Sequence, residues 1–159
     1  PEPGEVIFWN TGDWSELRRL AGHSHAVRSL AFSGDGRLVA SAAEDGRVIV
    51  TNAETYVTVA EYQNAEGTRP IAMSPDGTHL AVGLHDGTIN VWDTERGEVV
   101  QRFQSEDDVF GVSYSSDGTV IFSVSGEERV EAWPVMGIPA EESSIVEKIK
   151  QWSMQRLVE

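Results

Sequence analysis

Histidine, serine and aspartate residues lie near one another in the first third of the chain, and such residues build metal sites and hydrolytic sites. His23 and His25 form a His-x-His pair, which could supply two metal ligands, but the chain has no cysteine to accompany them. Three serines near His23 and Asp45 offer hydroxyl groups for a catalytic triad: Ser24, Ser29 and Ser41. A repeat in the sequence accounts for these positions, so we expect neither a metal nor a nucleophile here.

Motifs for other chemistry do not occur in the sequence. We find no nucleophile elbow, no phosphate-binding glycine loop and no His-Glu-x-x-His pair. The Asp-Gly turns lack the spaced carboxylates of a calcium loop. We therefore expect a protein that is not an enzyme and has no cofactor, with no catalytic, cofactor-binding or metal-binding residues.

The segment from Ile71 to Asp93 shows how the chain is organised. It contains three short apolar runs, separated by Ser74–Gly77 and by His85–Gly87. Pro-Asp-Gly and Asp-Gly between β-rich runs predict hairpin turns, because glycine adopts the positive φ that such reversals need. The segment therefore predicts three antiparallel strands.

The same pattern recurs along the chain at a period of 41 residues. The turn Ser74–Gly77 has counterparts at Ser33–Gly36 and Ser115–Gly118. Asp86-Gly87 has counterparts at Asp45-Gly46 and, in degenerate form, Glu127-Glu128. Trp92-Asp93 has counterparts at Thr51-Asn52 and Trp133-Pro134, and Trp9-Asn10 is offset by one residue.

A period of about 40–45 residues with four strands per unit is typical of a propeller blade. With Gly22-His23, the Ser-x-Asp-Gly turns, the Asp-Gly pairs and Val91-Trp92-Asp93, the chain resembles the WD-repeat β-propeller family over residues 5–136. This resemblance implies an all-β fold of four-stranded antiparallel blades, here a partial propeller.

The blades can be placed along the chain. We expect a partial blade at 5–21, three blades at 22–63, 64–104 and 105–136, and an amphipathic helix within 137–159. The first unit lacks two inner strands, and Pro134 and Pro139 interrupt the last unit before an outer strand can form. The count is about 13 strands, fewer than a closed propeller needs. We expect the C-terminal part of a larger propeller, or a half-propeller completed by another chain.

The last segment changes from a strand period to a helical one. Ile145, Ile149 and Trp152 share one face at helical spacing, and Ser144 with Glu147 fits a capping box. These three apolar residues are the candidate contact of the helix, which could pack on the propeller rim or dock into a partner.

The net charge of −14 favours some partners over others. Nucleic acid and anionic membranes require the opposite sign, so a basic peptide or protein subunit is the electrostatically easier partner. The charge could equally serve solubility alone. The absence of cysteine fits a reducing compartment, and we expect a cytoplasmic protein.

The resemblance implies a buried tetrad in each complete blade, joining a histidine, a serine or threonine, an aspartate and a tryptophan. The positions that match the family pattern are His23, Ser41, Asp45, Asp86, Trp92, Ser123 and Trp133. Five positions depart from it: Thr51, Asn64, Val82, Ser105 and Glu127. No blade has a complete tetrad, so we expect these residues to be structural.

The loops that enter each blade and follow its second strand should lie on one face, where such proteins usually bind other proteins. The candidate partner-binding residues are His25, Glu44, Glu66, Arg69, His85, Glu106, Asp107, Asp108 and Glu128. We expect a non-catalytic interaction scaffold or recognition module within a larger protein or complex. The alternative is a regulatory propeller domain of a multidomain enzyme, such as a signalling ATPase or protease.

Overall fold

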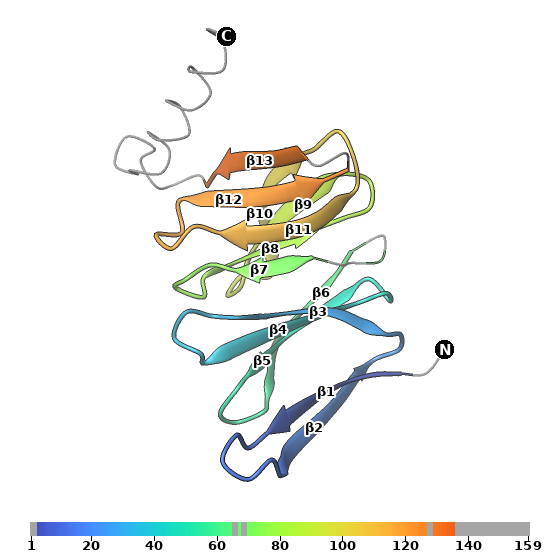
Figure 1. Ribbon diagram of the computed structural model, residues 1–159, viewed down its shortest axis with the longest axis vertical. Coiled ribbons are helices and arrows are strands. Elements are labelled where there is room, and N and C mark those ends of the chain that lie inside the picture. Colours follow the sequence, from blue (N-terminus) through green and yellow to red (C-terminus); the bar gives the residue numbers. More distant parts are fainter. Residues whose placement is uncertain (1–2, 65–66, 68–69, 127–128, 136–159) are drawn as a thin grey trace, which may run out of the picture.

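The structure is a computed structural model that describes residues 3–64, 67, 70–126 and 129–135. Thirteen β-strands in these residues form four antiparallel sheets (Figure 1). The first sheet is a hairpin of β1 (Gly4–Trp9) and β2 (Glu16–His23). The second contains β3 (Val27–Phe32), β4 (Leu38–Ala43), β5 (Arg47–Asn52) and β6 (Thr58–Gln63).

The third and fourth sheets repeat the same order of strands. The third contains β7 (Ile71–Met73), β8 (His79–Gly83), β9 (Thr88–Asp93) and β10 (Glu98–Gln104). The fourth contains β11 (Val109–Tyr114), β12 (Val120–Ser125) and β13 (Arg129–Pro134). The sheets follow one another in chain order, from the β1–β2 hairpin to the β11–β13 sheet at the opposite end (Figure 1).

A shared turn joins the first and second strands of each larger sheet. After β3, the Ser33 hydroxyl donates to Asp35 Oδ1 at 2.7 Å, and the same oxygen accepts the N–H of Arg37 at 3.0 Å. The turns after β7 and β11 repeat this arrangement with Ser74, Asp76 and Thr78, and with Ser115, Asp117 and Thr119. The side chains thus satisfy turn groups that have no partner in the ladder.

Two glycines allow adjacent turns to approach each other closely. The N–H of Gly34 donates to the carbonyl of Pro75 at 3.1 Å, and a Cβ at Gly34 would lie 2.5 Å from that oxygen. Gly87 has φ +82°, and a Cβ there would lie 2.6 Å from the carbonyl oxygen of Ser105. A larger residue at either position would push adjacent turns apart.

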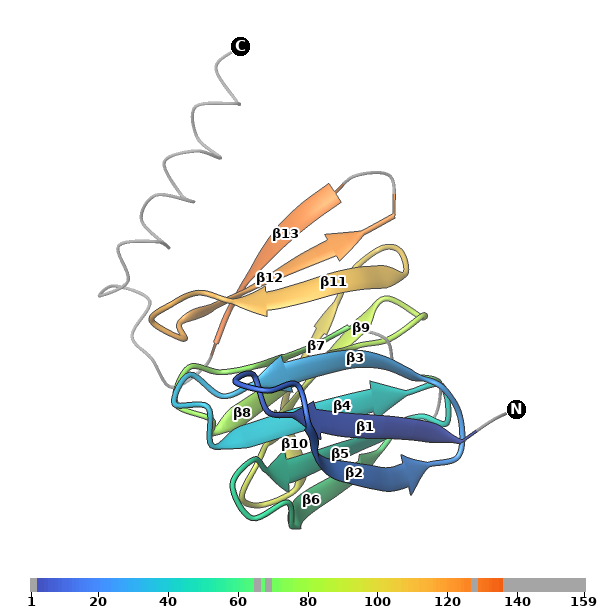
Figure 2. The ribbon, with the colours of Figure 1, turned by 60° about the horizontal axis from the view of Figure 1, so that its bottom comes forward.

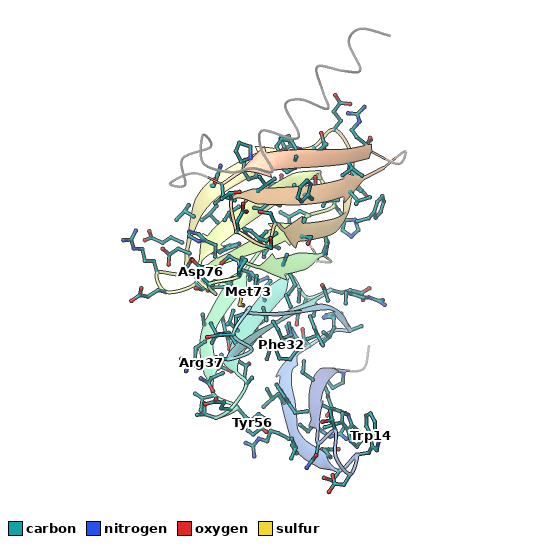
Figure 3. The ribbon with its side chains drawn as sticks, turned by 60° about the vertical axis from the view of Figure 1, so that its left-hand side comes forward. Trp14, Phe32, Arg37, Tyr56, Met73 and Asp76 are labelled. Carbon is teal, nitrogen blue, oxygen red and sulfur yellow. The ribbon has the colours of Figure 1, made fainter. Side chains whose placement is uncertain are left out.

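Two apolar cores lie between the three larger sheets. The first joins residues such as Val48 and Val50 to Met73, Leu80 and Val82. The second joins the third and fourth sheets through residues such as Ile89, Val91, Val109 and Ile121. Figure 3 labels Met73 within this stack, and Phe32 on β3 nearer the hairpin.

The all-β prediction and the four-stranded antiparallel sheets are confirmed. The predicted count of about 13 strands agrees with the thirteen strands in the described residues. The predicted C-terminal helix lies outside the described residues, and the proposed blade boundaries stay predictions. Among the described residues, no helix is long and apolar enough to cross a membrane.

Candidate functional site

The strand order divides the connections between two ends of the molecule. Because neighbouring strands are antiparallel, every connection that follows an even-numbered strand lies at one end of its sheet. Contacts between such loops support this grouping, since a Cβ at Gly67 would lie 3.2 Å from the carbonyl oxygen of Glu44. We call the end that carries these connections the entry end.

The entry end contains the candidate partner-binding residues that the structure describes. These are His25, Glu44, His85, Glu106, Asp107 and Asp108, whereas Glu66, Arg69 and Glu128 lie outside the described residues. His25 precedes β3, Glu44 follows β4 and His85 follows β8. Residues 106–108 form the connection from β10 to β11. The structure gives the positions of these residues but does not test whether they bind a partner.

Several carboxylates at the entry end already have an arginine or a histidine beside them. Arg28 donates from Nη2 to Glu44 Oε1 at 2.5 Å, and Asp108 Oδ2 lies 3.4 Å from Nδ1 of His85. Glu106 pairs with Arg129, and their hydrogen bond raises the pKa of the Arg129 guanidinium. These pairs are exposed, so water screens them strongly. The electrostatic potential at this end is negative, and the intramolecular pairs reduce its magnitude locally.

A buried polar network underlies the entry end in the second sheet. His23 Nε2 and Ser41 Oγ are 2.8 Å apart, and His23 Nδ1 lies 3.5 Å from Asp45 Oδ1. Burial alone would raise the pKa of Asp45, but hydrogen bonds from the N–H groups of Arg47 and Ser24, with His23 beside it, outweigh burial and lower the pKa. Three of the four expected tetrad positions are therefore in contact.

This network has the atom order of a Ser-His-Asp triad, but its serine lies inside the sheet. Ser41 is only 6% exposed and lies in β4, a strand that is paired on both sides. The ladder therefore occupies the backbone N–H groups that an oxyanion hole would need. His25 lies within 3.0 Å of the Ser24 hydroxyl, so the two histidines of the His-x-His pair engage different serines.

In the second sheet, Thr51 occupies the position at which the family pattern has tryptophan, and a cavity of about 90 Å³ lies beside it. The cavity is lined by Leu20, His23, Ser41 and Thr51, among others. In the next two blades this place holds an indole that stacks on the preceding sheet. Trp92 lies 4.8 Å from Tyr62 and Trp133 lies 5.2 Å from Phe103, measured between ring centroids. Thr51 is too small to fill the equivalent space.

The third and fourth sheets differ at the acceptor of the indole N–H. Trp133 Nε1 donates to Ser123 Oγ at 2.8 Å, as the family pattern implies. Trp92 Nε1 is buried and has no hydrogen-bond partner among the described residues, because Val82 occupies the place of the serine. The structure thus joins Ser123 to Trp133, whereas Asp86 Oδ1 accepts the N–H of Thr88 at 2.9 Å.

Two polar contacts at the position of the tetrad histidine were not predicted from the sequence. Asn90 Nδ2 donates to Asn64 Oδ1 at 3.4 Å, and Ser105 Oγ donates to Glu131 Oε2 at 2.5 Å. Asn90 and Glu131 occupy the third-strand position that is Ile49 in the second sheet, one repeat apart each time. The polar residues at this position were the sequence feature from which these contacts could have been predicted. No group of three or more metal-ligating side chains occurs in the described part of the chain.

Comparisons with known proteins agree with this repeat. A family model described as WD domain, G-beta repeat matches residues 14–52. A second model, described as Anaphase-promoting complex subunit 4 WD40 domain, matches residues 57–117. The two matches follow one another and together cover most of the chain.

Two curated proteins are similar to parts of the chain. The Periodic tryptophan protein 2 homolog of Dictyostelium discoideum is 29% identical over 65 residues, which is 39% of this chain and 7% of that protein. Autophagy-related protein 18 of Schizosaccharomyces pombe is 33% identical over 46 residues, which is 29% of this chain and 12% of that protein. The matched region thus spans a small share of either relative.

Proposed function

Because the chain belongs to the WD40-repeat family, we propose that it is a non-catalytic recognition module that binds a basic segment of another protein at its entry end. WD40 domains generally act as protein-interaction scaffolds, and the sheets of this chain hold its loops on a rigid frame. The proposal extends that general role to one face and one class of partner.

The acidic connection of residues 106–108 carries this proposal. It places three consecutive carboxylates between β10 and β11, beside the loop that contains His85. Arg129 pairs with this connection through Glu106. A basic peptide could therefore gain attraction from Asp107 and Asp108 without first displacing that pair. Loops on a rigid scaffold are where binding residues commonly occur.

Charge reversal tests the proposal. The probe is a fluorescein-labelled peptide of alternating arginine and serine, measured by fluorescence anisotropy at low and physiological salt. We expect the triple variant E106K/D107K/D108K to weaken binding at least tenfold, because attraction becomes repulsion. The control is E54K/E95K, which places two reversals on exposed loops at the opposite end.

Comparison of the triple variant with the control shows which results would reject the proposed binding face. Equal weakening by both variants would show that net charge attracts the peptide without a defined face. Unchanged binding by the triple variant would exclude the entry end. Retained sheet structure in both variants, measured by circular dichroism, separates loss of binding from loss of fold.

A further inference from the structure

The outer face of the β11–β12–β13 sheet is apolar and exposed. Val124 lies opposite Val130 in the ladder, and Phe122 lies opposite Ala132, so these side chains share one face. Val124 is 43% exposed and Val130 is 66% exposed. The opposite face, which includes Ile121 and Trp133, packs against the third sheet. Each larger sheet thus has a covered face, but Val124 and Val130 on this outer face have no cover among the described residues.

This face also differs from the rest of the surface in charge. The strand register assigns eight residues to it, and none is charged: Gly111, Ser113, Val120, Phe122, Val124, Val130, Ala132 and Pro134. In the whole chain, 24% of residues are charged. A connected uncharged face with exposed valines is the kind of surface that another element covers.

We propose that residues 141–157 of this same chain form a helix that covers this face through Ile145, Ile149 and Trp152. The proposed helix and the sheet face agree in length. From residue 145 to residue 157 a helix extends about 18 Å, and a strand of six residues extends about 20 Å. One helix can therefore lie along the full length of β12 and β13.

The position of the chain favours an intramolecular cover. The described part ends at Val135, directly after β13 at the free edge of the sheet (Figure 2). Nine residues, 136–144, then precede Ile145. A chain of that length spans up to about 30 Å, whereas three strands are about 10 Å wide. The segment can therefore cross to the outer face, and its tether gives it a high effective concentration there.

The absence of native cysteine provides a direct test in the full chain. The double variant V130C/I149C carries the only two thiols, which a short bismaleimide reagent can join across two packed layers. We expect a cross-link within one chain, with a yield that does not change on tenfold dilution. The matched control is V59C/I149C, because Val59 on β6 is also exposed, at 54%, but lies on another sheet.

Each outcome bears on the proposal. A dilution-independent cross-link in V130C/I149C, with at least a fivefold lower yield in V59C/I149C, supports it. Cross-links that form only between two chains would overturn it in favour of a second copy as the cover. Equal yields in the two variants, or no cross-link in either, would also overturn it. Ile149→Asp provides a second readout, with an expected severalfold rise in the fluorescence of a dye that binds exposed apolar surface.

Discussion

Trp92 and Trp133 occupy equivalent positions, but only Trp133 has a hydrogen-bond acceptor among the residues that the structure describes. Within this part of the chain the buried Trp92 N–H is unpaired beside Val82, and leaving such a donor without a partner costs about 1–3 kcal/mol. Val82→Thr keeps the volume and adds a hydroxyl where Ser123 accepts the N–H of Trp133. We expect Val82→Thr to change the free energy of unfolding by less than about 0.5 kcal/mol, since the new bond offsets the buried hydroxyl.

The matched control for Val82→Thr is Val48→Thr. Both valines are fully buried in the same core, but Val82 occupies the acceptor position for an indole N–H. The control should therefore lose about 1–2 kcal/mol. Urea unfolding followed by tryptophan fluorescence measures both variants. Equal losses would show that the Trp92 N–H does not reach a hydroxyl at position 82.

Thr51 leaves space that an indole fills in the following blades. Thr51→Trp should fill the cavity of about 90 Å³ and donate from Nε1 to Ser41 Oγ, as Trp133 does to Ser123. The expected gain is about 1–2 kcal/mol at about 24 cal/mol per Å³, reduced because the cavity is partly open. Thermal unfolding of Thr51→Trp with and without Ser41→Ala tests the hydrogen bond. Additive effects of the two substitutions would exclude it.

The Ser-x-Asp-Gly turn is a repeated element that is sensitive to acid. Burial tends to raise the pKa of Asp76, but hydrogen bonds from Ser74 and Thr78 outweigh it and lower the pKa from 3.8. A lowered pKa in the folded state stabilises the fold above about pH 4, and this contribution is lost as the pH falls through the folded pKa. The turn should therefore weaken as the pH falls below about 4.

Asp76→Asn isolates this titration. Asparagine Oδ1 can still accept from Ser74 and Thr78, but it does not ionise. We expect slightly lower stability at pH 6 and a shallower loss below about pH 4, measured by urea unfolding at a series of pH values. Ser74→Ala removes a donor and should also flatten the acid loss while lowering stability at pH 6. An unchanged acid slope in both variants would contradict a lowered Asp76 pKa.

The strands could be predicted from the sequence because the turns that end them have local sequence signals. Ser74–Gly77 and its two counterparts fix where β7, β3 and β11 end, and each apolar run follows directly. The contacts Asn64–Asn90 and Ser105–Glu131 could not be predicted in the same way. They join residues 26 apart along the chain through the register of several strands, which a family pattern built on histidine does not contain.

At the scale of the whole molecule, the stack has an incompletely covered face beside the hairpin. Leu30 lies opposite Ser41 and Phe32 lies opposite Val39, so both point to the side on which β1 and β2 pack. The hairpin helps to bury Val39 and Ser41, but Leu30 stays 52% exposed and Phe32 57% exposed. This pattern follows from a first unit with two strands in the described residues, because a further inner pair would cover β3.

This open face predicts self-association of the isolated chain in spite of its net charge of −14. Burying one side chain such as Leu30 or Phe32 contributes about 1.5–3 kcal/mol, and exposed apolar surface next to a strand edge favours association. We expect L30E/F32E to lower the mass measured by light scattering after size exclusion, whereas V57E/V59E, at the start of β6, should not. A wild-type chain that stays monomeric at all concentrations would contradict the prediction. It would also show that the hairpin side needs no further strands to remain stable in water.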